Sequence, residues 1–188
     1  NLKEILSMIT TKRLLLRQWQ PSDFPLFAEL CADPDVMQFF PSTLSEAESM
    51  ALAQRVHGLI AERGWGLWAV QVPGVSDFIG FVGLHVQKDY LPFSPCVEIG
   101  WRLAKSYWGK GYASEAAKAA LNYAFTELQL DEVLSFTSVT NLPSQAVMKR
   151  IGMTNTHRNF MHPDIEASHP LCEHVLYRLK RSEWARGD

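Results

Sequence analysis

Apolar positions recur along the chain with two different periods, and segments of the two kinds follow one another. A period of two, with many β-branched and aromatic residues, predicts strands over residues 11–19, 65–72, 78–86, 96–103, 133–140 and 175–179. Helical spacing predicts helices over residues 22–30, 45–64, 116–128 and 144–150. The pattern therefore predicts one mixed α/β domain around a central sheet, ending in a polar tail.

Polar residues and glycines lie where several of these segments should begin or end. Ser22-Asp23 is a typical cap for the first helix, and Ser45 with Glu48 forms a capping-box pattern for the second. Gly64 follows the second helix, and residues 73–76, Pro-Gly-Val-Ser, predict a hairpin turn between two strands. A strand meander should therefore follow the second helix.

Composition and charge narrow the class of protein. The 188 residues are enough for one domain with a substantial core. The formal net charge is −2 and no run of like charges occurs, so nothing predicts a nucleic acid or an anionic membrane as partner. No apolar stretch approaches the roughly 18–20 residues of a membrane span, and the three cysteines lack a Cys-x-x-Cys spacing. We expect a soluble, cytoplasmic protein that is a monomer or a homodimer.

The segment from Ser106 to Glu115 lies between an apolar strand and an Ala-rich helix, and it contains Gly109 and Gly111. Glycines let the main chain approach a ligand closely, and free N–H groups at a helix start attract anions. Gly111 directly follows Lys110, which excludes a Walker A loop, and Ser114 stands where a dinucleotide-binding fingerprint has Gly or Ala. The remaining interpretation is a pyrophosphate-binding loop of another kind. The alternative is a turn that leads into the helix and binds no ligand.

Three blocks of the sequence resemble the GNAT superfamily of N-acetyltransferases. Residues 108–113 are similar to its acyl-CoA loop, Gln/Arg-x-x-Gly-x-Gly/Ala, with Trp108 at the first anchor. Residues 141–153 resemble its Asn-x-x-Ser segment, apolar helix and Gly-Phe ending. Residues 11–17, followed by Asp23 and residues 33–36, resemble the opening of the branch that contains the ribosomal-protein N-terminal acetyltransferases, the Rim type. Together the blocks extend from about residue 10 to the C-terminus.

This resemblance implies a GNAT domain over residues 8–188, with acetyl-CoA as cosubstrate and a splayed, mostly antiparallel central sheet flanked by helices. Residues 1–7 precede the similar sequence and are interpreted as an extension or a remnant outside the domain. The resemblance also implies that loop N–H groups hold the pyrophosphate and that main-chain groups of the preceding strand hold the pantetheine arm. The residues expected to bind the cofactor are Trp101, Arg102, Leu103, Trp108, Gly109, Lys110, Gly111, Tyr112, Ala113, Ser114, Asn141 and Ser144.

Some of these residues have a second interpretation. Asn141 and Ser144 are also typical of a turn cap and a helix start, and Lys110 is also typical of a solvated lysine. The sequence alone is compatible with both interpretations.

Acetyl transfer to an amine also requires groups that move protons. Glu98 alternates with apolar neighbours on a strand expected to border the cofactor, so it is the leading candidate for the base. A solvent-facing or arginine-paired glutamate is the alternative, and His85 is a second candidate for the base. Many GNAT enzymes have a tyrosine general acid at the position of Met148. Methionine donates no proton, so Ser144, a water or solvent should supply it.

Histidines near the C-terminus raise the question of a metal site. His157, His162, His169 and His174, with Cys172, contain ligand types that zinc prefers, but no His-x-x-x-His or Cys-x-x-Cys spacing occurs. We therefore expect no metal. The proline-containing segment 161–171 is expected to close over the acceptor site instead.

Together, these observations predict an acetyl-CoA-dependent N-acetyltransferase that moves the acetyl group directly to a primary amine in a ternary complex. Glu98 and Ser144 are its expected catalytic residues. The Rim-type resemblance favours a protein N-terminal α-amine as acceptor. The alternatives are a small-molecule amine or antibiotic acetyltransferase, an enzyme for longer acyl donors, and a non-catalytic acyl-CoA-binding module, which Trp108 and Met148 keep open.

Overall fold

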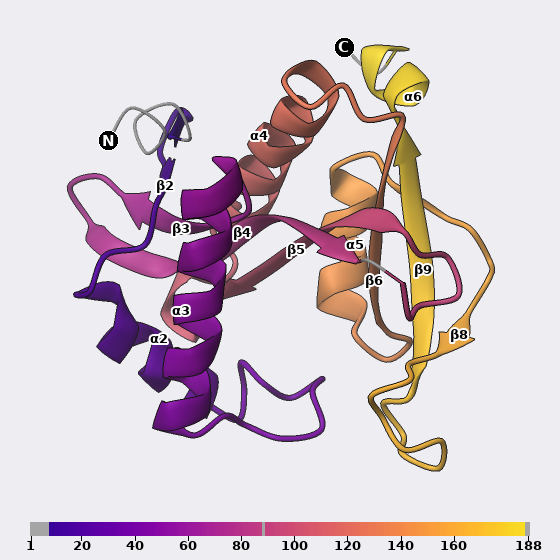
Figure 1. Cartoon of the computed structure of the whole chain (residues 1–188), viewed down its shortest axis with the longest axis horizontal. Helices are drawn as coiled ribbons and strands as arrows, with labels where there is room; N and C mark the ends of the chain where they lie inside the picture. Colours follow the sequence, from indigo (N-terminus) through magenta and orange to yellow (C-terminus); the bar gives the residue numbers. More distant parts are fainter. Residues whose placement is uncertain (1–7, 88, 187–188) are drawn as a thin grey trace.

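Nine strands form one sheet in the computed structural model, which describes residues 8–87 and 89–186 (Figure 1). The strands are β1 Ile9–Thr10, β2 Leu15–Arg17, β3 Leu67–Val72, β4 Ser76–Gln87, β5 Cys96–Leu103, β6 Glu132–Ser138, β7 Thr154–Asn155, β8 Phe160–Met161 and β9 Glu173–Lys180. The helices are α2 Asp23–Ala32, α3 Glu46–Arg63, α4 Tyr112–Thr126, α5 Leu142–Arg150 and α6 Arg181–Arg186, with a 3₁₀ turn, η1, at Lys105–Tyr107. Residues 1–7, interpreted above as an extension or remnant, lie outside the described residues.

The order of the strands is β1-β2-β3-β4-β5-β6-β9-β7, with β8 paired to β9. Neighbouring strands run antiparallel except β5 and β6, which are parallel. Among the described residues, β5 and β6 share one ladder position, Glu98 opposite Leu134, and Ser135 Oγ donates a hydrogen bond to the Ile99 carbonyl at 2.9 Å. Beyond this divergence point β6 no longer pairs with β5. The mixed, mostly antiparallel open sheet flanked by helices is confirmed.

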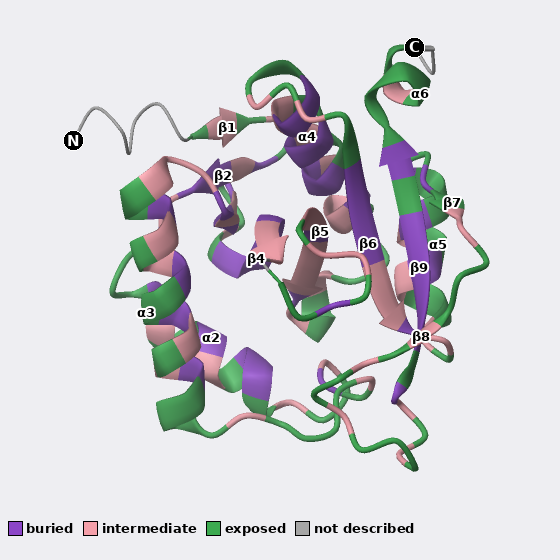
Figure 2. Cartoon of the chain, turned by 45° about the vertical axis from the view of Figure 1, so that its right-hand side comes forward, coloured by how far each residue is buried: buried purple, intermediate pink, exposed green. Residues whose placement is uncertain are grey.

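Side-chain alternation assigns the two faces of the sheet to different helices. Trp68 of β3 is fully buried and contacts Tyr123 of α4 with ring centroids 5.3 Å apart, so α4 covers that face (Figure 1). On the opposite face, Phe81 of β4 packs on Phe27 of α2 at 5.9 Å. The buried residues of α4, purple in Figure 2, belong to the hydrophobic core together with residues of the long strands. Successive side chains of β5 point to opposite faces of the sheet, so each of them faces either α4 or the α2–α3 side.

Local signals account for several helix ends. In α3, Ser45 Oγ accepts from the Glu48 N–H and the Glu48 side chain accepts from the Ser45 N–H, so the expected capping box is present. Gly64 ends the helix in the left-handed region with φ 88°. Ser22 is the N-cap residue of α2, as expected, but its side chain makes no capping hydrogen bond. Asp23 is instead buried against Arg17, 2.8 Å away.

Two other expectations need correction. The strand expected over residues 11–19 is interrupted, because the Thr11 N–H bonds to the Leu14 carbonyl and forms a tight turn between β1 and β2. The polar tail expected after residue 179 is helical as α6, and Trp184 packs on Phe125 of α4 with ring centroids 5.8 Å apart. A six-residue segment with a single large apolar side chain gave too little periodicity to predict a helix.

Candidate functional site

The glycine loop leaves the start of α4 open to a ligand. Gly109 and Gly111 both have positive φ, 72° and 78°. Residues other than glycine adopt such angles only at a cost in free energy. Gly111 is the N-cap residue of α4, and no side chain caps this end. The first N–H groups of an α-helix have no partner within the helix, so those of α4 are available to an anion. The loop geometry fits a diphosphate.

Trp108, at the first anchor of the loop, has a structural contact. Its indole Nε1 donates to the Leu103 carbonyl at 2.9 Å, and the residue is 42% exposed. The ring thus ties the loop to the last residue of β5. Lys110 is exposed, and its carbonyl accepts from Arg13 Nη1 at 2.9 Å.

Arg13 is a residue of the loop region that the sequence did not reveal. Its Nε lies 2.7 Å from Glu115 Oε1, its main-chain N–H bonds to Oε2 at 2.9 Å, and its guanidinium lies 4.6 Å from the ring of Tyr112. Thr11 donates to the same carboxylate at 2.6 Å. Burial raises the pKa of Glu115, but the hydrogen bonds from Thr11 and Arg13 outweigh it and lower the pKa below its usual value. We call Thr11, Arg13 and Glu115 the strap.

Asn141 and Ser144 lie at the start of α5, beyond the point where β5 and β6 diverge. Asn141 caps the helix, because its Oδ1 accepts from the Ser144 N–H at 3.2 Å and its Nδ2 donates to Thr137 Oγ1 at 2.9 Å. The Ser144 hydroxyl accepts from Trp101 Nε1 at 3.4 Å. Both groups of the Asn141 amide thus have protein partners, whereas the Ser144 hydroxyl proton is free to point elsewhere. Met148 is 1% exposed and belongs to the core.

Glu98 lies at the divergence point itself. Its side chain is partly buried, and Gln87 Nε2 donates to Oε1 over 3.4 Å. Burial raises the pKa of Glu98 to about 8, while the Gln87 hydrogen bond opposes the rise. A carboxyl group with that pKa can accept a proton near neutral pH.

The other candidate for the base, His85, is the residue of β4 directly opposite Glu98. Burial and the positive charges of Arg63 and Arg55 lower the pKa of His85, so the imidazole is mainly neutral at pH 7. Opposite residues of an antiparallel pair share a face, so His85 and Glu98 lie together on the α2–α3 side of the sheet.

The C-terminal loop approaches the segment before β5. Tyr90 donates to Asp164 Oδ2 at 2.6 Å, and the rings of His162 and His174 lie 5.0 Å apart. This contact joins the segment 161–171 to residues 89–95. Within the described part of the chain, no group of three or more His, Cys, Asp or Glu side chains could hold a metal.

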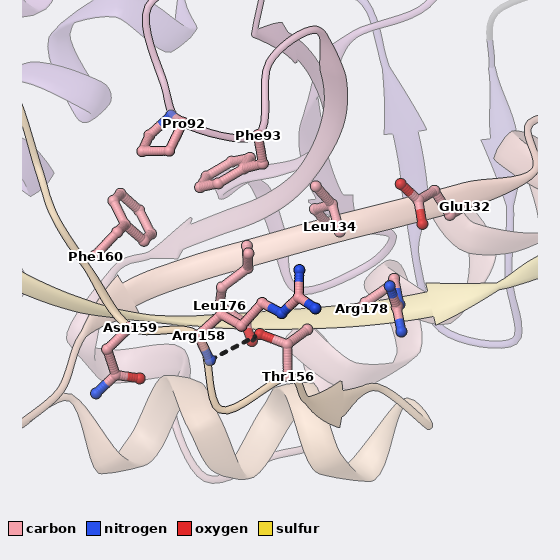
Figure 3. A pocket seen from close by; sticks show the side chains of 10 residues that line it. All are labelled: Pro92, Phe93, Glu132, Leu134, Thr156, Arg158, Asn159, Phe160, Leu176 and Arg178. Atoms are coloured by element: carbon pink, nitrogen blue, oxygen red, sulfur yellow. Dashed lines mark hydrogen bonds between the residues drawn. The ribbon is translucent and has the colours of Figure 1, made fainter.

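A separate cavity of about 460 Å³ lies beside this loop, on the face that Leu134 shares with Glu98 (Figure 3). It is lined by Pro92, Phe93, Glu132, Leu134, Thr156, Arg158, Asn159, Phe160, Leu176 and Arg178. Phe93 and Phe160 pack edge to face, with centroids 4.9 Å apart. Arg158 and Arg178 give this cavity two exposed cationic groups against one carboxylate.

The fold and these residues match a known acetyltransferase class. A family model described as the acetyltransferase (GNAT) domain matches residues 13–154. The N-acetyltransferase YnaD of Bacillus subtilis, itself uncharacterized, is 31% identical over 94% of this chain and 98% of its own length. An FsC-acetyl coenzyme A-N(2)-transacetylase of Aspergillus fumigatus is 31% identical over 84% of this chain and 69% of its own length.

Solved structures agree with this result. An acetyltransferase of the GNAT family from Bacillus anthracis superposes with a TM-score of 0.75 and 26% identity, covering 93% of this chain and 99% of its own. A RimL ribosomal L7/L12 α-N-protein acetyltransferase in complex with coenzyme A has a TM-score of 0.72 at 18% identity, covering 92% and 97%, which shows a shared fold.

The chain therefore belongs to the GNAT acetyltransferase family. It is an N-acetyltransferase, and acetyl-CoA is its cosubstrate. None of the helices in residues 8–87 and 89–186 is both long and apolar enough to cross a membrane.

Proposed function

We propose that this N-acetyltransferase acetylates the α-amine of a protein N-terminus, by direct transfer in a ternary complex. The observation that carries the proposal is the position of Glu98, at the divergence of β5 and β6, with a pKa raised to about 8. The resemblance to Rim-type enzymes favours a protein N-terminus over other amines.

Different residues of the chain bind acetyl-CoA and transfer protons. N–H groups of residues 109–114 bind the pyrophosphate at the start of α4, and the strap fixes that loop. The Trp108 N–H takes no part, because it bonds to the Lys105 carbonyl at 3.1 Å. The β5 main chain from Trp101 to Leu103, which has no β6 partner, orients the pantetheine arm. When bound, acetyl-CoA supplies an acetyl group already activated as a thioester. Placing the two reactants side by side contributes to the rate gain by removing the entropy cost of bringing them together.

Glu98 accepts a proton from the ammonium group of the acceptor, directly or through a water molecule, and the neutral amine that results attacks the thioester carbonyl. The Ser144 hydroxyl of α5 accepts from Trp101 Nε1 at 3.4 Å, and its own proton can be donated to the leaving thiolate. Asn141 positions Ser144 through the cap of α5.

A small-molecule amine as acceptor is the second candidate. It is favoured by the similarity to the FsC transacetylase, at 31% identity. The two candidates differ in the acceptor alone and share the machinery described above.

The test is acetyl-CoA-dependent thiol release by the purified protein against N-terminal peptides, polyamines, free amino acids and aminoglycosides. Saturable release with peptides is the expected result. Release with one of the small amines and with no peptide would contradict the protein acceptor. Calorimetry with acetyl-CoA separates a missing acceptor from a loop that does not bind, because binding without turnover leaves the loop assignment intact.

A further inference from the structure

The side chain of Arg102 lies on the face of β5 that also contains Glu98, four residues away along the strand. Its guanidinium lies over two aromatic rings, 4.6 Å from the ring centre of Phe40 and 5.3 Å from that of Phe81. This arrangement fixes the plane of the guanidinium and leaves its edges for hydrogen bonds.

Those edges are poorly satisfied within the protein. Nη1 donates to the thiol sulfur of Cys31 at 3.4 Å, and sulfur is a weak acceptor. Nε is buried and has no hydrogen-bond partner among the described residues. No carboxylate of the described chain lies within ion-pair distance of Arg102. A buried guanidinium donor without an acceptor is unusual, because such groups are normally paired.

Open space separates Arg102 from Glu98. Gly100 lies between them on the same face, and a Cβ added there would meet no atom within 4 Å. Four residues of strand span about 13 Å at roughly 3.3 Å per residue. The face of β5 thus presents a carboxyl group, an empty position and a cationic group in a row.

We propose that Arg102 binds an anionic group of the acceptor while Glu98 receives the proton of its amine, so that the enzyme prefers acceptors that carry a carboxylate near the amine. The inference rests on the proposed function and assigns its substrate class. The spacing favours the carboxylate of an Asp or Glu side chain within the first residues of a peptide. The α-carboxylate of a free amino acid is the other source of the same chemistry.

Arg158 and Arg178 form the rival cationic site. Arg158 and Arg178 line the same cavity (Figure 3). Arg178 lies opposite Leu134, and Leu134 lies opposite Glu98, so Arg178 is two strands across the sheet from Glu98, whereas Arg102 is four residues along β5. Arg158 and Arg178 are exposed, no aromatic ring lies over either guanidinium among the described residues, and Glu132 lines the same cavity. Arg178→Gln is therefore a matched control.

The experiment measures kcat and KM for two peptides that differ at one residue, with N-terminal Ser-Asp and Ser-Asn, and for free serine. Wild-type protein should use the Ser-Asp peptide about 10- to 100-fold better in kcat/KM, mainly through KM, as expected for a charge-assisted hydrogen bond. Arg102→Gln should bring the ratio of the two peptides close to one, Arg102→Lys should keep part of it, and Arg178→Gln should keep all of it. If free serine is preferred over both peptides, the anionic group that Arg102 binds is the α-carboxylate of a free amino acid.

Three results would overturn the inference: equal use of the two peptides by wild-type protein, a preference that survives Arg102→Gln, or a preference lost in Arg178→Gln alone. If neither peptide is acetylated, peptide binding to the CoA-loaded protein is measured by calorimetry. Equal affinities there refute the role of Arg102, whereas a Ser-Asp preference without turnover refutes the proposed acceptor reaction and leaves the anion site standing. Arg102→Lys keeps the test valid if Arg102→Gln fails to fold.

Discussion

Glu98 is held near a pKa of 8 because burial disfavours its charged form more than Gln87 stabilises it. The fraction of deprotonated Glu98 therefore rises about tenfold per pH unit below pH 8. We expect kcat/KM for a primary amine to rise with pH and level off near pH 8. Glu98→Gln should lower kcat by about 10²- to 10⁴-fold and remove this limb from the profile measured between pH 5.5 and 9.5. An unaltered profile in Glu98→Gln would remove Glu98 from the mechanism.

The same shift predicts how stability depends on pH. The folded pKa of Glu98, about 8, lies above the unfolded value of about 4.5, so the folded state binds more protons between these values. Its contribution to stability is present below pH 4.5 and is lost as pH rises through 8. We expect Glu98→Gln to raise Tm at pH 8.5 to 9 relative to wild type, and to have little effect at pH 5. Equal differences in Tm at the two pH values would contradict the raised pKa.

Individual residues differed in how far the sequence could reveal them. Glu98 was a candidate because a lone carboxyl group in an apolar strand is unusual, and its position at the divergence point follows from pairing that no local pattern encodes. Arg13 was missed because its partner, Glu115, is 102 residues away in the sequence. The unpaired Nε of Arg102 depends on the placement of Phe40 and Phe81 around it. Such contacts are tertiary and leave no trace in periodicity.

At the scale of elements, the strap connects the β1–β2 turn to the first turn of α4. Arg13 reaches both Glu115 and the Lys110 carbonyl, so it fixes the loop from two sides. Arg13→Ala should free the loop and raise the Kd for acetyl-CoA about 3- to 10-fold, given the modest energies of partly exposed pairs. The value of kcat at saturating acetyl-CoA should change little, because Arg13 contacts no group assigned to proton transfer. Calorimetry and a KM against kcat comparison measure the two effects.

Arg181→Ala is the control for this prediction. Arg181 also forms an ion pair, 3.2 Å to Asp131, but it lies at the start of α6 on the surface. Its loss should leave acetyl-CoA affinity unchanged. A Kd that rises equally in Arg181→Ala and Arg13→Ala would show a general effect of charge and refute the strap.

The elements themselves were predicted where a local rule governs them. The capping box and Gly64 correctly predicted the two ends of α3, and the turn at residues 73–76 predicted the β3–β4 hairpin. These signals act within a few residues and can therefore be read from the sequence. At Ser22 the pattern predicted the start of α2, but the side chain makes no capping bond, and the neighbouring Asp23 forms a tertiary contact with Arg17. The short strands β7 and β8 were not predicted, since two residues give no period to detect.

At the scale of the whole molecule, one buried ion pair joins the N-terminal elements. Arg17 bonds to Asp23 through Nη1 at 2.8 Å and Nη2 at 2.9 Å, and it also donates to Gln71 of β3 and to the Asp77 carbonyl of β4. Asp23→Asn leaves the buried guanidinium without its counter-charge. We expect a loss of about 3–5 kcal/mol of unfolding free energy in urea titrations. A loss below about 1 kcal/mol would mean that water solvates Arg17 in the folded protein.

Two glycines of the sheet, Gly83 on β4 and Gly100 on β5, lie directly opposite each other but have very different surroundings. A Cβ at Gly83 would lie 2.0 Å from the Gly66 carbonyl oxygen, whereas one at Gly100 would meet nothing within 4 Å. Gly83→Ala should therefore unfold or strongly destabilise the protein, by roughly 3 kcal/mol or more given backbone that cannot move aside. Gly100→Val should keep Tm within a few degrees of wild type.

The same Gly100→Val change should raise KM for the amine acceptor at least tenfold, because its side chain fills the space between Glu98 and Arg102. The Kd for acetyl-CoA should change far less, since the loop at the start of α4 lies on the other face of the sheet. Differential scanning fluorimetry of both glycine variants, with acceptor kinetics of the folded one, measures the contrast. A Gly100→Val protein that is stable and has an unchanged acceptor KM would place the amine elsewhere, and the row of Glu98, Gly100 and Arg102 would then have no part in acceptor binding.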